Sequence, residues 1–384
     1  MLPLPPLYPI TDASAPEPLS EQVRRFGEWG FPLVQFRGKP LGAQAQWVEL
    51  RKALEESAQR GGWPLIVVND RADLALLAAQ AGLAPWGLHL GQEDLPPPAA
   101  RILPELAQLH LGTSTHSPAE WNGVEDSCDH AGVGPYRGTA SKPGHNPPIG
   151  PSGLEAGCRS LRARGITPIA IGGLTAGDLR DGFRAGAESL AMIGELRRCP
   201  DPGGLLWRAQ LERWRIRPPF AKGQGLLLAG SSGAGKSTLA QALAQRLGLP
   251  CLDLDDVIVD QAGASIPRIF ESEGEAGFRA RETEAALRCL ASRAVVALGG
   301  GAWQSEALRR AAAASGFAAL WIAETPMRCW ARAGGDPDRP LAGAESTFYA
   351  RHRARIGHWS ALPCILPLGR EPHALSEALA SALD

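Results

Sequence analysis

Short apolar runs recur along the first 195 residues and alternate with polar, helix-like stretches. Strands that read as continuous apolar runs between helices are typical of a parallel sheet covered on both faces. Eight such βα units within about 215 residues predict an α/β fold of the (β/α)₈ TIM-barrel type, with an open doubly wound sheet as the alternative. The runs are LYPIT, PLVQF, PLIVV, GLHLG, LHLGT, HAGVG, TPIAI and SLAMI, at residues 7–11, 32–36, 64–68, 87–91, 109–113, 130–134, 167–171 and 189–193.

A second set of alternating segments follows the predicted barrel. DPGGLLWRAQLERW predicts a closing helix, and RIRPPFAKGQG then carries two prolines and two glycines without periodicity. We therefore predict a barrel domain at 1–215, a linker at 216–224 and a further domain at 225–384. In the last, the apolar runs LLLAG, CLDLD, AVVALGGG, AALWIA and CILPL alternate with helix-forming segments, which predicts a second parallel sheet.

Composition narrows the class of partner. The 384 residues are 44% hydrophobic and carry a formal net charge of −1, which gives no reason to expect binding to nucleic acid or to an anionic membrane. There is no run of about 18 apolar residues and no basic N-terminal leader pattern. The seven cysteines are scattered without a C-x-x-C pair, as in reduced proteins. We expect a cytoplasmic protein whose partners are small molecules, and leave its oligomeric state open.

The most specific motif is G-S-S-G-A-G-K-S at residues 230–237, between an apolar run and a helix-like segment. It matches the phosphate-binding pattern G-x-x-x-x-G-K-[ST], in which backbone N–H groups and the helix N-terminus cradle phosphates. Lys236 would reach the β- and γ-phosphates, and the Ser237 hydroxyl would bind Mg²⁺. The predicted ATP-binding residues are Gly230, Gly233, Ala234, Gly235, Lys236, Ser237 and Thr238.

Two carboxylates follow on the next predicted strand. Asp253 and Asp255 lie in CLDLDD, and strand alternation would put both on one face at the carboxyl end of that strand. Asp253 could support Mg²⁺ through water, and Asp255 could orient or deprotonate an attacking hydroxyl as a catalytic residue. An ordinary acidic strand end is the alternative.

From this point the second half resembles shikimate kinase, over about residues 225–370. The resemblance rests on IPRIFESEGEAGFRARE, on the glycines that end AVVALGGG, on DRPLAG and on RIGHW. It implies that Arg339 contacts ATP and assists catalysis with Lys236 and Asp255. RIGHW departs from the family pattern R-x-P-x-Y and follows Ala354 instead of glutamate, which leaves open a different acceptor or an ATP-binding regulatory domain. The implied shikimate-binding residues are Asp255, Arg279, Gly299, Gly300, Gly301 and Arg355.

Polar residues gather where the strands of the predicted barrel end, the place where such barrels build their active sites. Arg37, Lys39 and Lys142 are cations suited to a pyrophosphate. Asp70 and Asp94 follow adjacent strands and are hard oxygen ligands suited to Mg²⁺. Glycines after the seventh and eighth strands are typical of a barrel phosphate site.

These residues resemble the thiamine-phosphate synthase family over about residues 6–200, through LYPITD, QFRGK, VVND, GLHLGQED, LGTSTHS, GVGPYRGTASKPG and PIAIGGL. The resemblance implies condensation of hydroxymethylpyrimidine pyrophosphate with a thiazole phosphate, Mg²⁺ on Asp70 and Asp94, and a catalytic Lys142. The implied pyrimidine-pyrophosphate ligands are Gln35, Arg37, Lys39, Asn69, Ser114 and Lys142; those for the thiazole phosphate are Thr139, Ser141, Gly172, Ile193 and Gly194.

Two features qualify this second resemblance. The family usually has a V-S pair near the end of the eighth strand, where this chain has Ile193-Gly194 and so lacks one hydroxyl. The sister family of thiazole tautomerases has the same fold, and His116 could act as its acid and base. Retention of Arg37, Asp70 and Asp94 with Lys142 favours the synthase, so we expect a bifunctional enzyme with Mg²⁺ in both domains and ATP as kinase substrate.

Overall fold

The computed structural model describes residues 3–138, 147–334 and 344–383. Contacts between Cα atoms divide the chain into two compact units. The first comprises Met1–Ala58 and Trp63–Ile216, and the second comprises Gln59–Gly62 and Arg217–Asp384. Within the described residues, no helix combines the length and the apolar character that crossing a bilayer requires.

The first unit is a closed barrel of eight parallel strands, so the predicted barrel is confirmed and the open sheet is wrong. The strands follow the order β1-β8-β7-β6-β5-β4-β3-β2, and the sheet closes where Ile10 forms a parallel bridge with Gln35. The strands are β1 (Leu7–Pro9), β2 (Leu33–Phe36), β3 (Leu65–Asn69), β4 (Gly87–Leu90), β5 (His110–Thr115), β6 (His130–Val133), β7 (Thr167–Ala170) and β8 (Ser189–Met192).

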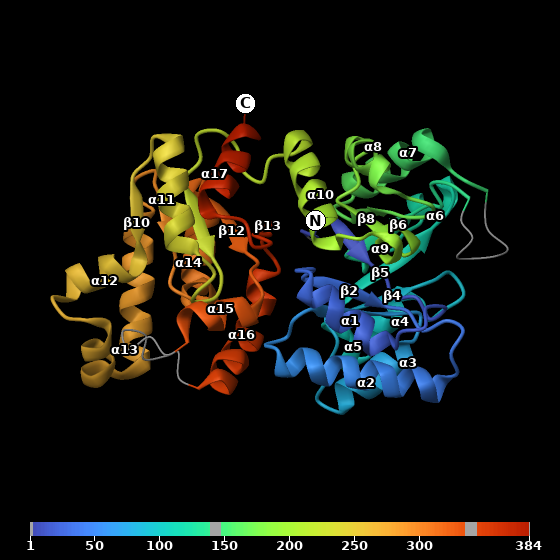
Figure 1. Ribbon diagram of the computed structural model, residues 1–384, viewed down its shortest axis with the longest axis horizontal. Helices are drawn as coiled ribbons and strands as arrows, with labels where there is room; N and C mark the ends of the chain where they lie inside the picture. Colours follow the sequence, from blue (N-terminus) through green and yellow to red (C-terminus); the bar gives the residue numbers. More distant parts are fainter. Residues whose placement is uncertain (1–2, 139–146, 335–343, 384) are drawn as a thin grey trace. The chain divides into compact units, whose positions relative to one another are not determined.

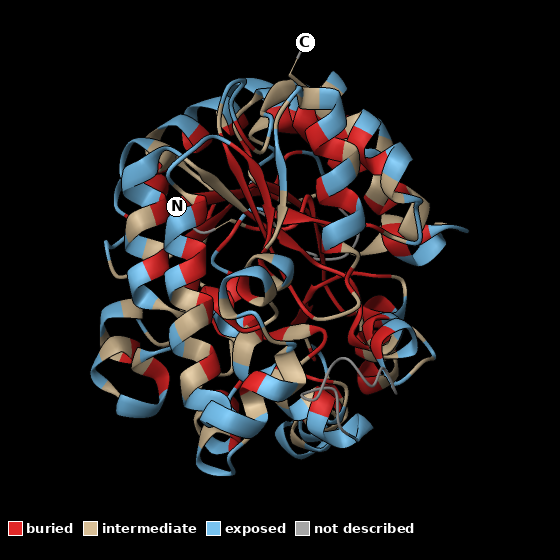
Figure 2. Cartoon of the chain, turned by 90° about the vertical axis from the view of Figure 1, so that its left-hand side faces the viewer, coloured by how far each residue is buried: buried red, intermediate tan, exposed pale blue. Residues whose placement is uncertain are grey.

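Helices surround these strands, as expected for a parallel barrel (Figure 1). The barrel strands are buried almost throughout, and the helices around them carry both buried and exposed positions. Figure 2 shows the same pattern in the second unit, whose strands are mostly buried and whose helices are exposed on their outer side. The helices are α1 (Leu19–Glu28), α2 (Ala43–Gln59), α3 (Ala72–Gln80), α4 (Pro97–Ile102), α5 (Pro104–Ala107), α6 (Pro118–Asn122), α7 (Gly150–Ala163), η1 (Ala176–Asp178), α8 (Leu179–Arg184), α9 (Gly194–Arg198) and α10 (Pro202–Ile216).

The second unit holds the predicted parallel sheet, with all five strands present. Its order, β10-β11-β9-β12-β13, places the strand that precedes the phosphate-binding motif at the centre. The elements are β9 (Leu226–Ala229), α11 (Lys236–Leu247), β10 (Cys251–Asp253), α12 (Leu254–Ala262), α13 (Ile266–Cys289), β11 (Val295–Ala297), η2 (Ala302–Gln304), α14 (Glu306–Ser315), β12 (Ala318–Ile322), α15 (Pro326–Ala333), α16 (Glu345–Trp359), β13 (Cys364–Ile365) and α17 (Pro372–Ser381).

Two boundaries differ from the sequence-based expectation. Helix α10 continues to Ile216, the first residue of the segment predicted as a linker. Strand β10 ends at Asp253 and helix α12 begins at Leu254, so the apolar run CLDLD is only partly strand.

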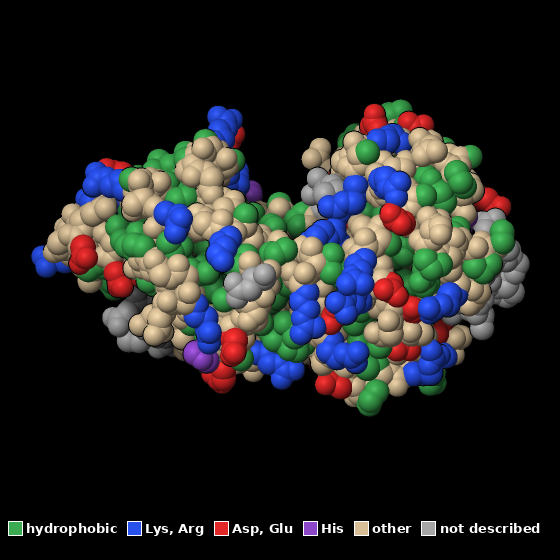
Figure 3. Space-filling model, turned by 90° about the horizontal axis from the view of Figure 1, so that it is seen from above, with side chains coloured by type: hydrophobic (Ala, Val, Ile, Leu, Met, Phe, Trp, Pro, Cys, Tyr) green, Lys and Arg blue, Asp and Glu red, His purple; other side chains and the backbone are tan. Residues whose placement is uncertain are grey.

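On the face shown in Figure 3, basic side chains are interspersed with acidic ones, in keeping with the near-zero net charge.

Candidate active sites

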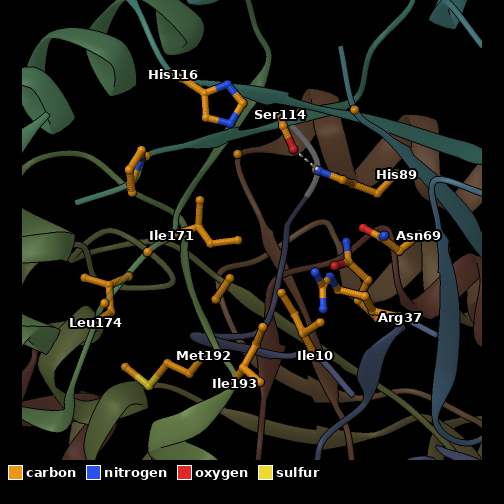
Figure 4. A pocket seen from close by; sticks show the side chains of 18 of the residues that line it. Ile10, Arg37, Asn69, His89, Ser114, His116, Ile171, Leu174, Met192 and Ile193 are labelled. Atoms are coloured by element: carbon orange, nitrogen blue, oxygen red, sulfur yellow. Dashed lines mark hydrogen bonds between the residues drawn. The ribbon is translucent and has the colours of Figure 1, made fainter. Parts of the chain in front are cut away.

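A cavity of about 690 Å³ opens at the carboxyl ends of the barrel strands. Figure 4 shows polar Arg37, Asn69 and His89 on one side of it and apolar Leu174 and Met192 on another. A mixed lining of this kind suits a ligand with a ring and a charged group. Ten of the residues predicted from the sequence line this cavity: Gln35, Arg37, Lys39, Asn69, Asp70, Asp94, Ser114, Gly172, Ile193 and Gly194. Thr139, Ser141 and Lys142 lie outside the described residues.

Arg37 follows β2, and its backbone is fixed by a residue that sequence reasoning missed. The Arg37 N–H donates to Thr11 Oγ1 at 2.8 Å, and the Thr11 hydroxyl donates back to the Arg37 carbonyl at 3.1 Å. Thr11 is completely buried. This reciprocal pair joins the ends of β1 and β2, so the closure of the barrel itself positions the Arg37 side chain.

Asp70 and Asp94 lie together in the cavity wall. Asp70 has a left-handed backbone (φ 63°) and forms an ion pair with Lys39. Burial alone would raise the pKa of Asp70, but the Lys39 ammonium outweighs it and the pKa is lowered. The pKa of Asp94 is raised, because burial raises it and the nearby Asp70 carboxylate raises it further. A hydrogen bond from the Gly91 N–H at 2.7 Å lowers it, but not enough to cancel these two effects.

Two facing carboxylates of this kind are suited to a divalent cation. Among the described residues, no group of three or more His, Cys, Asp or Glu side chains is arranged to hold a metal. The pair therefore fits Mg²⁺ only if water and a phosphate-bearing ligand complete the coordination, as is usual for that ion.

A buried histidine pair, formed by His89 in the cavity lining and His130 outside it, was also missed. His89 Nε2 lies 3.0 Å from Ser114 Oγ (Figure 4). On the other side of the ring, His89 Nδ1 lies 3.4 Å from His130 Nε2. Burial lowers the pKa of His130 well below its ordinary value, and the neighbouring His89 adds to this. His89 thus fixes Ser114 at the cavity wall. Its position as a polar residue in the apolar run GLHLG was the available signal.

His116 also lines the cavity (Figure 4), and it pairs with the Glu120 carboxylate. Its Nδ1 lies 2.9 Å from Glu120 Oε2, and its backbone N–H donates to the same oxygen at 2.8 Å. Glu120 therefore orients the imidazole ring. Such a pair has the chemistry of a general acid and base.

The phosphate-binding motif of the second unit forms a tight loop between β9 and α11. Gly233 (φ 78°) and Gly235 (φ 87°) have left-handed backbones, and a side chain on Gly233 would collide with the Cys329 carbonyl. Lys236 is 8% exposed, and its Nζ donates to the Ser231 carbonyl at 2.8 Å, so the ammonium lies over the loop. The predicted residues Gly230, Ala234, Ser237 and Thr238 belong to the same loop and first helical turn.

The strand-face argument for Asp253 and Asp255 is wrong. Asp253 is the last residue of β10 and the N-cap of α12, where its Oδ1 accepts the Asp255 N–H at 3.0 Å. Asp255 lies in the first turn of the helix instead of on the strand. The acidic residue at the strand end caps the helix, and this cap holds Asp255 in place.

Gly299, Gly300 and Gly301 follow β11 and make room for polar side chains. A Cβ on Gly299 would meet Glu282 and the Asp255 carboxylate, and one on Gly300 would lie 3.4 Å from Arg355 Nη1. A Cβ on Gly301 would overlap the Arg279 guanidinium. The glycine triplet therefore forms the floor on which the predicted acceptor-binding residues meet.

Arg279 and Arg355 converge on this floor with a buried acid. Arg279 Nη1 lies 2.5 Å from Glu282 Oε2, and Glu282 is 1% exposed. Burial raises the pKa of Glu282 and Asp255 adds to it, while Arg279 and Arg355 oppose it. Burial lowers the pKa of Arg355 to about 10, with the neighbouring Arg279 contributing, so the Arg355 guanidinium stays charged at neutral pH. Arg339 lies outside the described residues.

Fold and sites together define two enzymes in one chain, a (β/α)₈-barrel transferase and a P-loop kinase. The family models for Thiamine monophosphate synthase and Shikimate kinase match residues 7–196 and 232–356. The chain therefore belongs to the thiamine-phosphate synthase family over its N-terminal half and to the shikimate kinase family over its C-terminal part.

Individual relatives agree with this division. A thiamine-phosphate synthase of Chloroflexus aurantiacus is 37% identical over 191 residues, covering 49% of this chain and 82% of the relative. A shikimate kinase of Rhodopirellula baltica is 51% identical over 133 residues, covering 33% of this chain and 70% of the relative. A thiamine-phosphate synthase of Gloeobacter violaceus is 40% identical over 201 residues and 51% of this chain, which spans only 54% of that relative's length.

Proposed function

We propose that the barrel condenses hydroxymethylpyrimidine pyrophosphate with a thiazole phosphate to give thiamine phosphate and pyrophosphate. The observation that carries this is the meeting of Lys39, Asp70 and Asp94 at one side of a cavity with a partly apolar lining. The Lys39 cation, with a Mg²⁺ ion that the two carboxylates would hold, would neutralise a departing pyrophosphate, while the apolar side receives the ring.

The chain's own residues have separate tasks in this reaction. Arg37, held by Thr11, binds the pyrophosphate oxygens, and Lys39 moves between Asp70 and the ligand. Asp70 and Asp94 would hold Mg²⁺, which supplies charge stabilisation to the leaving group. Ser114, which His89 holds in place, forms a hydrogen bond with the pyrimidine ligand through its hydroxyl group. The glycine backbone after β7 offers N–H groups to the thiazole phosphate.

For the second unit we propose transfer of the ATP γ-phosphoryl group to shikimate. Lys236 and the loop amides bind the phosphates, and Ser237 with Asp253 would hold Mg²⁺, which would supply charge neutralisation for the transferring phosphoryl group. Arg279 and Arg355 bind the acceptor carboxylate, while Asp255 accepts the proton of the attacking hydroxyl. Glu282 keeps Arg279 aimed at the glycine floor.

The barrel reaction is tested by incubating the full chain with both substrates and Mg²⁺ and measuring pyrophosphate and thiamine phosphate. Stoichiometric formation of both products supports the proposal. A thiazole tautomerase, the rival that the His116–Glu120 pair supports, would release no pyrophosphate. Omission of the thiazole phosphate is the control for simple hydrolysis.

The kinase reaction is tested by measuring ADP formation with and without shikimate. ADP formation that rises with shikimate and yields a phosphorylated product supports the proposal. Bound ATP with no stimulation by shikimate would indicate a regulatory domain, and stimulation by another polyhydroxy acid alone would indicate a different acceptor. A panel of polyhydroxy carboxylic acids distinguishes these outcomes. The panel is limited to carboxylic acids because the two arginines are expected to bind the carboxylate of the acceptor.

A further inference from the structure

Arg198, at the end of the short helix α9, lines the barrel cavity together with Gly172, Gly173 and Gly194. A Cβ added to Gly194 would lie 3.1 Å from Arg198 Nη1 and 3.8 Å from its Cζ. The guanidinium thus lies against the backbone of Gly194, in space that a larger residue would compete for. Position 194 contributes no side chain to the cavity, but it admits the Arg198 cation.

The two consecutive arginines of α9 differ in their surroundings. Arg197 donates to Asp12 Oδ2 at 3.0 Å and to Ser14 Oγ at 3.4 Å, and it is not part of the cavity lining. Arg198 has one recorded ion pair among the described residues, with Glu195 at 3.6 Å, and its side chain is 67% exposed. The separation exceeds an ordinary hydrogen bond, so the donors of Arg198 remain available to a ligand.

Backbone donors lie beside this cation. Gly172 (φ 95°) and Gly173 (φ 65°) have left-handed backbones, and within the described part of the chain no acceptor is recorded for either N–H group. Glu195 Oε1 accepts the Ala176 N–H at 2.9 Å, which ties the loop after β7 to α9. Successive amides of such a turn form an anion-binding concavity, and an arginine beside it adds charge and a fork of donors.

The strand order separates this site from the carboxylate pair. In a closed ring of eight strands, β7 is diametrically opposite β3, and β8 is opposite β4. Asp70 follows β3 and Asp94 follows β4, whereas Gly172 follows β7 and Arg198 follows β8. A ligand group bound at Arg198 is therefore distinct from one bound through the carboxylates.

We propose that Arg198 is a ligand of the thiazole phosphate and selects for that phosphate in the reaction proposed above, on which this inference rests. Its guanidinium would donate to the phosphate oxygens that the Gly172 and Gly173 N–H groups also reach. Because hydrogen bonds to a charged group are stronger than neutral ones, Arg198 contributes affinity specific to the phosphorylated substrate.

The test compares R198A with R197A, which removes the same side chain from the same helix outside the cavity. We expect R198A to raise KM for the thiazole phosphate about ten-fold and to leave KM for the pyrimidine pyrophosphate unchanged. R197A should leave both KM values at wild-type levels. With the dephosphorylated thiazole alcohol as acceptor, R198A and wild type should turn over equally.

An unchanged KM for the thiazole phosphate would overturn the proposal. Equal losses with the phosphate and the alcohol would do so as well, since they would indicate a structural role. If wild type forms no thiamine phosphate, the proposed synthase function fails by itself. Calorimetric titration of the full chain with thiazole phosphate then decides: weaker binding to R198A than to R197A supports the role of Arg198, and equal binding refutes it.

Discussion

Arg137 and Asp178 form a two-pronged ion pair between the loops that follow β6 and β7, with Nη1–Oδ2 at 2.7 Å and Nη2–Oδ1 at 2.6 Å. Asp178 Oδ2 also accepts the N–H and the hydroxyl of Thr175, each at 2.8 Å. The Arg137 N–H in turn donates to the Gly172 carbonyl at 3.0 Å. The pair therefore holds the glycine turn that we assign to phosphate binding.

We predict that the two partners contribute unequally to the free energy of unfolding. The Asp178 side chain is 6% exposed and that of Arg137 is 53% exposed. D178A removes a buried carboxylate that accepts hydrogen bonds from both Thr175 and Arg137 and should cost roughly 2 kcal/mol, whereas R137A should cost under about 1 kcal/mol because solvent screens its charge. Calorimetric unfolding of both variants measures this, and equal costs would contradict it.

The pH dependence of the same effect has a definite sign. Burial alone would raise the pKa of Asp178, but Arg137 and Thr175 outweigh it and the pKa is lowered. The stabilisation by Asp178 is therefore complete above its ordinary pKa of 3.8 and is lost as the pH falls through the lowered value. The difference in the free energy of unfolding between wild type and D178A should therefore become smaller in that acidic range.

Asp94 leads to a prediction about Mg²⁺. Burial and the Asp70 carboxylate raise its pKa, so protons compete with the metal at a higher pH than for an ordinary aspartate. The Mg²⁺ concentration that half-saturates thiamine phosphate formation should rise as the pH falls, beginning above pH 3.8. D94N should raise it about ten-fold or more at neutral pH and flatten the pH dependence.

The matched control for D94N is D73N. Asp73 lies in the first turn of α3, is 63% exposed and pairs with Arg71 outside the cavity. Titrations of activity with Mg²⁺ at several pH values should show D73N equal to wild type. A D94N enzyme with the same Mg²⁺ dependence as wild type would remove Asp94 from the proposed metal site.

The strands of the barrel could be predicted from the sequence because both faces of each strand are buried, so each strand is a largely continuous apolar run. The sequence was also sufficient for the residues that follow the strands, since parallel strands bring their carboxyl ends to one rim. His89 was missed because its role depends on Ser114 and His130, which come from other strands. Thr11 was missed for a similar reason, since its partner Arg37 becomes a neighbour only when the barrel closes.

Asp253 and Arg198 show a second limit of local patterns. Alternation along a strand assigned Asp253 and Asp255 to one face, but a helix starts at Leu254 and the first aspartate caps it. The side-chain direction of Arg198 depends on the turn into α9 and on the missing Cβ of Gly194. Such details are decided by the ends of elements, where sequence periodicity carries the least information.

Gly301 tests the part that Arg279 has in acceptor binding. Its φ of −106° suits alanine, but a Cβ would overlap the guanidinium of Arg279, the mobile end of a long side chain. G301A should therefore displace Arg279 from Glu282, and because Glu282 is buried, the loss of this partner should also lower the unfolding temperature. We predict that KM for shikimate rises about ten-fold while KM for ATP stays near the wild-type value. A comparable rise in KM for ATP would mean that the whole site is distorted.

Lys236 tests whether the two sites work independently. Its ammonium lies over the phosphate-binding loop, 2.8 Å from the Ser231 carbonyl, and no other lysine belongs to the motif. K236A removes a charge that stabilises the transferring phosphoryl group, so ADP formation should fall by about two orders of magnitude or more. Pyrophosphate release by the barrel should continue at the wild-type rate. K222A, which removes a lysine outside the loop, should leave both activities intact. Loss of both activities in K236A alone would show that the barrel depends on the kinase unit, because the substitution lies in the loop of the second unit and not in the barrel.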